Sequence, residues 1–575
     1  MRRGRVLVVL VAGLSLAVGQ WAGAAESTAA GKPAATRWAQ PMFHPLALEG
    51  IGAARKVKAN SHAASLNDGD SASQIQCKTN NASGAANLKL DCDSILPNNE
   101  PDIAVDPSDP NHMVASSNDY DQCCDAFYTT FNGGKTWYVG DMSVEAPGQN
   151  KRTGSDPVTT FDVKNGTVIH SSLNFLNNGC DGDVVVSISE DGGKKWNTIV
   201  EVMSGGGCDN PFNDKEWITT DNNPASPHYG TTYLTWTTFF GESREEEEGE
   251  GGGEGGAAGV DEIPPENPIY EAHSTDGGYT WSTPQEISGE NAALCTRELA
   301  DRPGACNDDQ FSVPSVAPDG TVYVSFINGQ NEALYEDTDE GDSQYLLVKS
   351  TDGGATWSDP EFVVGLENGE DDYPINVDGR QTLTNYQLRA PFTQGFVADP
   401  THNGRLYLVF SDNRNGVHDD PNPQTEADVF IMVKPGAASA WTGPFNVNTP
   451  DLGEIANDQW FPWVDVNPTN GEVGVVYHDR RYTSSFNRYG TTLAVSPAGG
   501  LAFTEQQVST ELSHPRQSVF FRAFAPGCKP CTRFHGDYIN IEYGSDGSAN
   551  MVWTDMRDFF DPAGGYLQFI YYAKV

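Results

Sequence analysis

The chain has 575 residues, with 79 Asp and Glu against 35 Lys and Arg, and a formal net charge of −44 at pH 7. This acidity excludes a general nucleic-acid binder, which needs clustered Lys and Arg, and argues against a protein that lies on anionic membranes. The 60 Gly and 35 Pro predict many short strands joined by tight turns rather than a helical bundle.

Residues 1–24 have the pattern of a secretory signal peptide. A basic start with Arg2, Arg3 and Arg5 precedes an apolar run over residues 6–18 that is too short to span a membrane, and Ala-Gly-Ala at 22–24 offers a cleavage site. We therefore predict a secreted or periplasmic protein with no membrane span after cleavage; an uncleaved anchor is the alternative. Residues 25–74, rich in Ala, Ser, Pro and Gly, predict a flexible segment.

The ten cysteines of an exported chain predict disulfides rather than metal ligands. Among the local pairs we favour Cys77–Cys92, in an entry segment over residues 75–99, and Cys295–Cys306. Cys528 and Cys531 form a Cys-x-x-Cys motif, which we interpret as a structural clip, with a redox pair as the alternative. The other pairings stay open.

An octapeptide of the form Ser/Thr-x-Asp-Gly-Gly-x-Thr-Trp recurs at 130–137, 189–196, 274–281 and 350–357, and weaker echoes end at Trp441 and Phe503. The glycines supply the positive φ angles of a tight turn, and the Asp side chain can accept bonds from the backbone N–H groups of the turn. Each octapeptide therefore predicts a hairpin turn. The residues with this structural role are Asn132, Trp137, Asp191, Trp196, Asp276, Trp281, Asp352 and Trp357.

The octapeptide is similar to the Asp-box, or BNR repeat, of the sialidase-like superfamily, and the resemblance covers most of the chain from about residue 100. It implies a β-propeller in which each Asp-box lies in the turn between the third and fourth strands of a blade. The resemblance also implies glycosidase chemistry on a glycan.

A second repeat gives the number of blades. Strands opened by an acidic residue begin at Glu100, Asp156, Asp214, Asp308, Asp458 and Asp537, and a degenerate unit begins near Arg389. The 476 residues of 100–575 divide into 68 per unit, which suits four strands. We predict an all-β propeller of seven four-stranded blades over 100–575, with six as the alternative. A strand near residues 85–90 should complete the last blade. The acidic, Gly-rich residues 241–261 predict a disordered loop; a calcium role there is the alternative.

Three arginines share the pattern aromatic-x-Asp-x-Arg after the second strand of successive units: Arg414, Arg481 and Arg557. Three guanidinium groups could bind a carboxylate by bidentate bonds, and the sialidase resemblance implies this role towards sialic acid. The alternative, which we favour, is that each arginine pairs with the aspartate two residues before it and fastens adjacent blades.

The acidic residues that open the innermost strands should face the mouth of the propeller, where they could act as acid and base of a glycosidase or bind a cation. The alternative is strand-end capping. The catalytic candidates are Asp214, Asp308, Asp458, Asp537 and Tyr538. The match to sialidases is incomplete, because the stretch over residues 98–102 lacks the expected Arg. Tyr538 and Glu542, four apart on a strand, should lie roughly 13 Å apart.

These patterns predict a secreted propeller that acts on or binds glycans. The alternatives are an exo-α-sialidase that uses the three arginines and a non-catalytic scaffold for protein partners. Exposed rings of Tyr120, Trp460, Tyr482 and Phe534 would stack on sugars. We expect a monomer that needs no cofactor, with calcium as an option.

Overall fold

The computed structural model describes residues 75–575 with gaps at 81–85, 93, 95, 121–124, 143–152, 176–181, 207–210, 241–265, 297–301, 303, 332–342, 367–374, 378–379, 382, 384–387, 391–392, 413, 415, 418–423, 450–456, 484–486, 500, 516–533 and 561–564. The predictions for residues 1–74, the acidic loop at 241–261 and the pair Cys528 and Cys531 lie outside the described residues.

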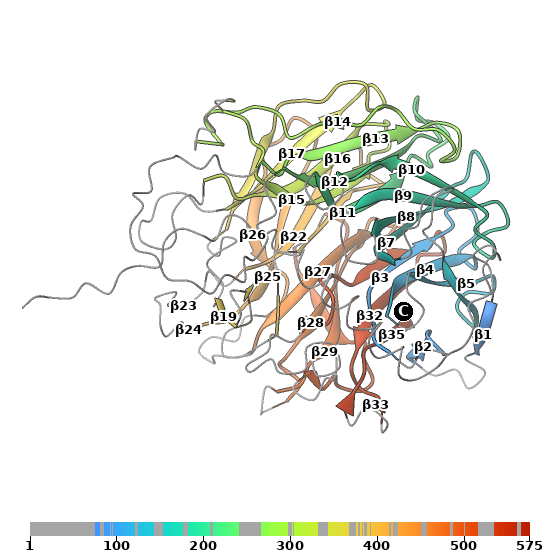
Figure 1. Ribbon diagram of the computed structural model, residues 1–575. Coiled ribbons are helices and arrows are strands. Elements are labelled where there is room, and N and C mark those ends of the chain that lie inside the picture. The colour runs from blue at the N-terminus through green and yellow to red at the C-terminus, as the bar shows by residue number, and fades with distance from the viewer. Residues whose placement is uncertain are drawn as a thin grey trace, which may run out of the picture. The chain divides into compact units, whose positions relative to one another are not determined.

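The described strands form seven antiparallel four-stranded sheets, which follow one another along the chain (Figure 1). Blade 1 contains β3 (Asn98–Val105), β4 (Met113–Asp119), β5 (Asp125–Thr130) and β6 (Thr136–Met142). Blade 2 contains β7 (Thr153–Asp162), β8 (Thr167–Phe175), β9 (Asp183–Ser189) and β10 (Thr198–Met203). Blade 3 contains β11 (Phe212–Thr220), β12 (Thr232–Phe239), β13 (Ile269–Ser274) and β14 (Gln285–Glu286). Blade 4 contains β15 (Asp309–Val316), β16 (Val322–Asn328), β17 (Gln344–Ser350) and β18 (Glu361–Gly365).

The remaining three blades complete the propeller. Blade 5 contains β21 (Gln394–Ala398), β22 (Leu406–Asp412), β25 (Asp428–Lys434) and β26 (Thr442–Asn446). Blade 6 contains β27 (Gln459–Val466), β28 (Val473–Asp479), β29 (Gly490–Ser496) and β30 (Thr504–Gln507). Blade 7 contains β31 (Asn540–Tyr543), β32 (Ala549–Asp555), β35 (Phe569–Lys574) and β2 (Leu88–Lys89). The additional short strands are β19 (Ile375–Val377), β20 (Arg380–Gln381), β23 (Gly416–Val417), β24 (Gln424–Thr425), β33 (Phe559–Phe560) and β34 (Gly565–Tyr566).

The seven blades close into a ring. The innermost strands contact one another in the cyclic order β3, β7, β11, β15, β21, β27, β31 and back to β3. The N-terminal strand β2 is the outermost strand of blade 7, where Leu88 and Lys89 pair with Tyr572 and Tyr571 of β35. The prediction of seven blades is therefore confirmed, and so is the closing strand near residues 85–90. The structure adds β1 (Ile75–Asn80), a fifth strand on blade 1 that the sequence did not predict.

The four octapeptides lie in the turns between the third and fourth strands of blades 1–4. In blade 3, Ser274 Oγ accepts the N–H of Gly278 at 3.0 Å, and Asp276 Oδ1 accepts the N–H of Thr280 at 2.9 Å. The turn between the first and second strands shares this end of the blade, because the N–H of Gly133 donates to the carbonyl of Asn111 at 2.9 Å. The innermost strands therefore begin at the opposite end.

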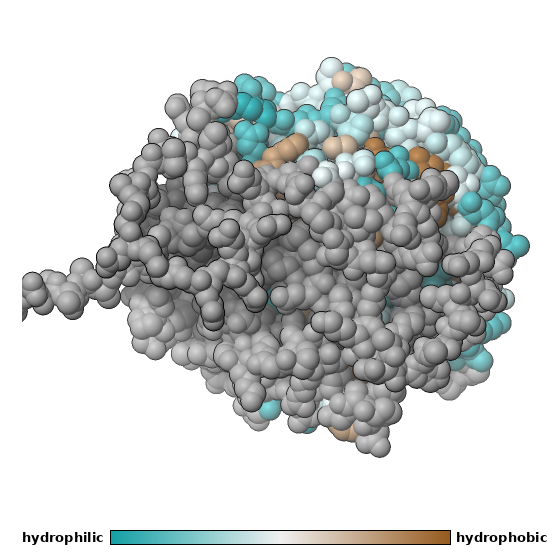
Figure 2. All heavy atoms as spheres, in the orientation of Figure 1, coloured by the Kyte–Doolittle hydropathy of each residue, from teal (hydrophilic) through white to brown (hydrophobic). Residues whose placement is uncertain are grey.

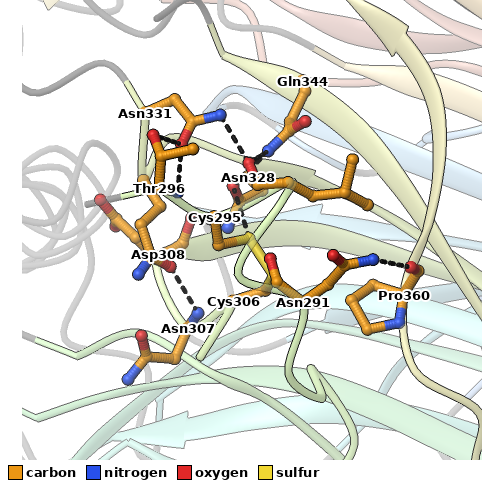
Figure 3. Close-up of a disulfide and its surroundings, with 12 residues drawn as sticks. Asn291, Cys295, Thr296, Cys306, Asn307, Asp308, Asn328, Asn331, Gln344 and Pro360 are labelled. Atoms are coloured by element: carbon orange, nitrogen blue, oxygen red, sulfur yellow. Dashed lines mark hydrogen bonds between the residues drawn. A yellow bond between two sulfur atoms is a disulfide. The ribbon is translucent and has the colours of Figure 1, made fainter. Parts of the chain in front are cut away.

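The Cys295–Cys306 disulfide is confirmed, with its Cα atoms 5.3 Å apart. Figure 3 shows it beside Asn328 at the loop end of blade 4. The side-chain amides of Asn331 and Gln344 both donate to the carbonyl of the preceding Leu294, at 2.6 and 2.8 Å. Cys92 is also disulfide-bonded. Because the side chain of Cys77 lies outside the described atoms, the Cys77–Cys92 pairing stays a prediction.

The described surface is largely hydrophilic on the side drawn in Figure 2, in keeping with the excess of Asp and Glu. Within the described ranges, no helix is long and apolar enough to cross a membrane.

Candidate functional site

A central cavity of about 320 Å³ is lined by the innermost strands of all seven blades. Three of its carboxylates join neighbouring blades: Asp102 accepts the N–H of Thr159 at 2.8 Å, Asp465 that of Tyr543 at 2.6 Å, and Glu542 that of Val105 at 3.0 Å. Burial raises the pKa of Asp102 and of Asp465 to about 7, and that of Glu542 well above its usual range. These acids therefore act as fasteners between innermost strands.

Five innermost strands carry a bulge near their start. The bulge holds a residue other than glycine in the left-handed region, with φ of 55° at Glu100, 61° at Asp156, 54° at Lys215, 54° at Phe311 and 53° at Phe461. Each interrupts the pairing with the second strand at the same place in its blade. Such a conformation costs about 1–3 kcal/mol per residue and is common at functional sites. The bulges lie where the innermost strands begin, at the end of the propeller axis opposite the octapeptide turns, and we call this end the mouth.

Seven side chains from blades 1, 2, 3 and 7 interact at the mouth, and we call them the mouth cluster: Glu100, Asp156, Asp214, Lys215, Glu216, Asp537 and Tyr538. Asn118 supports the cluster from β4, because its Nδ2 donates to Glu100 Oε2 at 2.5 Å and its Oδ1 accepts the N–H of Asp156 at 2.8 Å. Arg389 Nη2 lies 3.1 Å from Asp537 Oδ2. Five carboxyl groups thus share the mouth with two cations.

Burial and crowding set the protonation of these carboxyl groups. Burial and the charge of Asp156 raise the pKa of both Glu100 and Asp214 well above the usual range. Burial also raises the pKa of Asp537, but the neighbouring Arg389 limits the rise to about 6. Asp214 therefore favours its protonated form, whereas Asp537, with a pKa of about 6, is mostly ionised at pH 7. The phenol of Tyr538 stays protonated, because burial raises its pKa well above the usual range.

The structure brings three of the five catalytic candidates together in the mouth cluster, namely Asp214, Asp537 and Tyr538. Asp458 instead pairs with Arg480 and accepts the N–H of Ala427 at 3.2 Å. Asp308 accepts a bond from Asn267 Nδ2 at 3.0 Å. Both aspartates lie three residues before the bulge of their strand, whereas Glu100 and Asp156 occupy the bulge itself. The six acidic residues that open the innermost strands therefore do not all lie at the same height along the propeller axis.

The three arginines each bind the aspartate two residues before them. Arg414 contacts Asp412 at 2.5 Å, Arg481 contacts Asp479 at 2.7 Å, and Arg557 contacts Asp555 at 2.5 Å. Each also donates to a residue at or just after the end of the outermost strand of the preceding blade: Gly365 O for Arg414, Thr449 O for Arg481, and Thr510 Oγ1 for Arg557. This is the arrangement expected of blade fasteners. Binding of a ligand carboxylate by these arginines stays a prediction.

The prediction of exposed sugar-stacking aromatics is wrong for three of the four residues. Tyr120, Trp460 and Phe534 are only 8, 1 and 4 % exposed. The ring of Trp460 packs among His478, Tyr489 and His535, and its Nε1 donates to His535 Nε2 at 3.1 Å. Because these three rings are buried, they are not exposed surfaces on which a sugar could stack.

Sequence reasoning did not single out Lys215, Glu216 and Arg389 as members of this site. A usable signal was present, because Pro directly follows Glu100, Asp156 and Phe461, and Pro inside a strand pattern indicates a bulge. The described residues include no group of three or more His, Cys, Asp or Glu side chains that could hold a metal ion.

No family model and no curated protein matches this chain. Among solved structures, the NanB sialidase from Streptococcus pneumoniae is 9 % identical, with 81 % of this chain and 83 % of that chain covered and a TM-score of 0.41. The α-L-arabinofuranosidase Arb93A from Fusarium graminearum is 12 % identical, covering 72 % and 99 %, with a TM-score of 0.41. A protein of unknown function from Dyadobacter fermentans is 11 % identical, covering 85 % and 97 %, also with a TM-score of 0.41. These similarities assign no role to any residue of this chain.

Proposed function

We propose that the protein acts on glycans and hydrolyses a glycosidic bond at the mouth cluster, with Asp214 as the general acid and Asp537 as the general base or nucleophile. One observation carries this proposal: two carboxyl groups of the same cluster have pKa values that their surroundings set apart. Burial and the charge of Asp156 raise the pKa of Asp214 well above its usual range, whereas Arg389 beside Asp537 limits the rise there to about 6. A pair of carboxyl groups separated in this way is the acid–base arrangement that glycosidases use.

The reaction follows from these protonation states. Asp214 donates its proton to the oxygen of the leaving group as the glycosidic bond breaks. The carboxylate of Asp537 either takes a proton from the attacking water or attacks the anomeric carbon itself. Arg389 favours the ionised form of Asp537, and the phenol of the neighbouring Tyr538 stays protonated. The Cys295–Cys306 disulfide fits an oxidising compartment, as does the predicted signal peptide.

The exo-sialidase alternative would place the chemistry near the three arginines. All three already bind carboxylates of this chain, so a ligand carboxylate would have to compete with them. The scaffold alternative predicts no turnover at all.

The test is turnover of fluorogenic glycosides by the protein and its variants. The panel includes uncharged pyranosides, an α-L-arabinofuranoside and a sialoside, each with and without calcium. We expect Asp214→Asn and Asp537→Asn to lose about 10²–10⁴-fold in kcat/KM. Asp546→Asn, at a half-exposed turn carboxylate of blade 7, is the control and should keep full activity.

The pH profile gives a second readout. The rate should rise as pH increases through about 6, where Asp537 ionises, and this limb should disappear in Asp537→Asn. Full activity of Asp214→Asn contradicts the assignment. Sialoside turnover that depends on Arg481 but not on Asp214 would place the reaction at the arginines.

A further inference from the structure

Lys215 is a buried cation at the centre of the mouth. Its side chain belongs to β11, in the left-handed bulge position, and the residue is only 5 % exposed. Its ammonium nitrogen lies 3.9 Å from the ring centre of Tyr538, 4.1 Å from that of Trp217 and 5.6 Å from that of Phe311. These rings come from blades 7, 3 and 4, so the ammonium group lies near the central axis of the propeller.

The ammonium group of Lys215 has no hydrogen-bond acceptor among the described residues. Ring faces attract a cation, but they do not replace the three acceptors that an ammonium group has in water. Burial without acceptors is costly, and it lowers the pKa of Lys215 although Asp156, Glu216 and Glu100 act in the opposite direction. A buried ammonium group without an acceptor in the described part of the chain points to a role in binding rather than in packing alone.

Two neighbours of Lys215 also have buried polar atoms whose hydrogen-bonding properties complement those of its ammonium group. Asp537 Oδ1 and the hydroxyl of Tyr538 are buried and have no hydrogen-bond partner within the described part of the chain. Lys215 can only donate, an ionised Asp537 can only accept, and Tyr538 can do both. A hydroxyl group that accepts from Lys215 and donates to Asp537 would satisfy both at once. Neighbouring hydroxyls of a sugar ring offer this combination repeatedly.

We propose that Lys215 is a ligand-binding residue that holds a hydroxyl group of an uncharged sugar unit, in concert with Asp537. The inference rests on the proposed function and names its substrate class. A sugar that carries a carboxylate fits less well, because its negative charge would face the ionised Asp537 beside Lys215. The competing explanation is that Lys215 only clamps the rings of blades 3, 4 and 7 together.

The chain offers a matched control in Lys434, which is also 5 % exposed and lies 5.8 Å from the ring centre of Trp441. Unlike Lys215, Lys434 has a carboxylate partner, Glu361. Lys215→Met and Lys434→Met each replace a buried ammonium group by an uncharged chain of similar length. Only Lys215→Met should weaken the binding of a sugar.

The experiment measures KM, kcat and melting temperature for both variants. We expect Lys215→Met to raise the KM for an uncharged glycoside at least tenfold, with a smaller change in kcat, and to melt at or above the wild-type temperature. Lys434→Met should melt lower and keep its KM. An unchanged KM in Lys215→Met together with a lower melting temperature overturns the inference, and a sialoside preferred over every uncharged glycoside overturns the substrate class.

The failure of this inference differs from failure of the proposed function. If Asp214→Asn loses turnover while Lys215→Met keeps the wild-type KM, the proposed function stands and the proposed role of Lys215 is wrong. Wild-type protein that neither cleaves nor binds any glycan on an array removes the function and the sugar class together. In that case the melting temperature decides: a fall in Lys215→Met makes Lys215 a packing residue, and a rise retains it as a contact for another hydroxyl-bearing ligand.

Discussion

Gly193→Ala tests how the octapeptide turns hold the blades together. Gly193 lies in the turn between β9 and β10 with φ of +85°, and its carbonyl accepts a bond from Thr129 Oγ1 of blade 1 at 2.6 Å. A Cβ at this position would lie 2.6 Å from Cγ2 of Val114, which is fully buried. The substitution therefore strains the backbone and also presses one blade against its neighbour.

The two costs can be separated. A left-handed Ala costs about 1–2 kcal/mol, and overpacking a core contact adds about 1–3 kcal/mol, so Gly193→Ala should lose about 2–5 kcal/mol of unfolding free energy. Gly166, with φ of +74° and no atom within 4 Å of an added Cβ, is the matched control. Gly166→Ala should lose only the backbone part, about 1–2 kcal/mol.

Urea unfolding followed by Trp fluorescence, with the disulfides intact, measures both variants. The added Cβ of Gly193→Ala would press against Cγ2 of Val114, which Val114→Ala removes. The double variant should therefore lose at least about 1 kcal/mol less unfolding free energy than the sum of the losses of the two single variants. Equal losses for Gly193→Ala and Gly166→Ala would refute the close approach between the turn and blade 1.

Three further predictions concern the ring and its charges. Leu90→Ala, at a fully buried residue beside the closing strand, should lose about 2–5 kcal/mol of unfolding free energy in urea and speed amide exchange in β35; unchanged exchange would contradict closure by β2. The buried Asp102 has a pKa of about 7, above its value in the unfolded chain. Its contribution to the unfolding free energy is therefore fully present below pH 4, and it falls by about 1.4 kcal/mol per pH unit as the pH rises from 4 to 7. Melts of Asp102→Asn across that range should lack this slope, and an unaltered slope would show that other groups cause it. Arg481→Ala should lose about 3 kcal/mol, because the fully buried Asp479 would lose its partner, whereas the KM for uncharged glycosides should stay unchanged.

The fold could be predicted from sequence because its signals are local and repeated. Asp-Gly-Gly fixes a turn within a few residues, and four copies at similar spacing define the blades. The closing strand at Leu88 was predictable because the last blade lacked one strand. The fifth strand β1 was not, because Ile75–Asn80 belongs to no repeat and pairs with β6 more than 50 residues away.

The candidate site was predictable only in part, because a residue belongs to it only if its side chain lies at the right height along the propeller axis. Asp214 and Asp537 were found from their place at a strand start. Asp308 starts its strand in the same way, but a bulge three residues later changes which side chain reaches the mouth. Lys215 carries no repeated pattern, and its importance depends on three rings that come together only in the folded chain.

The pairing of β2 with β35 also bears on how the molecule is made. Phe569, the first residue of β35, follows Lys89 by 480 residues, so the ribosome needs roughly 25–100 s to supply the partner of β2. During that interval blade 7 does not exist, and β3 lacks its neighbour β31. The nascent chain therefore carries unpaired sheet edges until residues 540–574 have been made, and it depends on being kept from premature association.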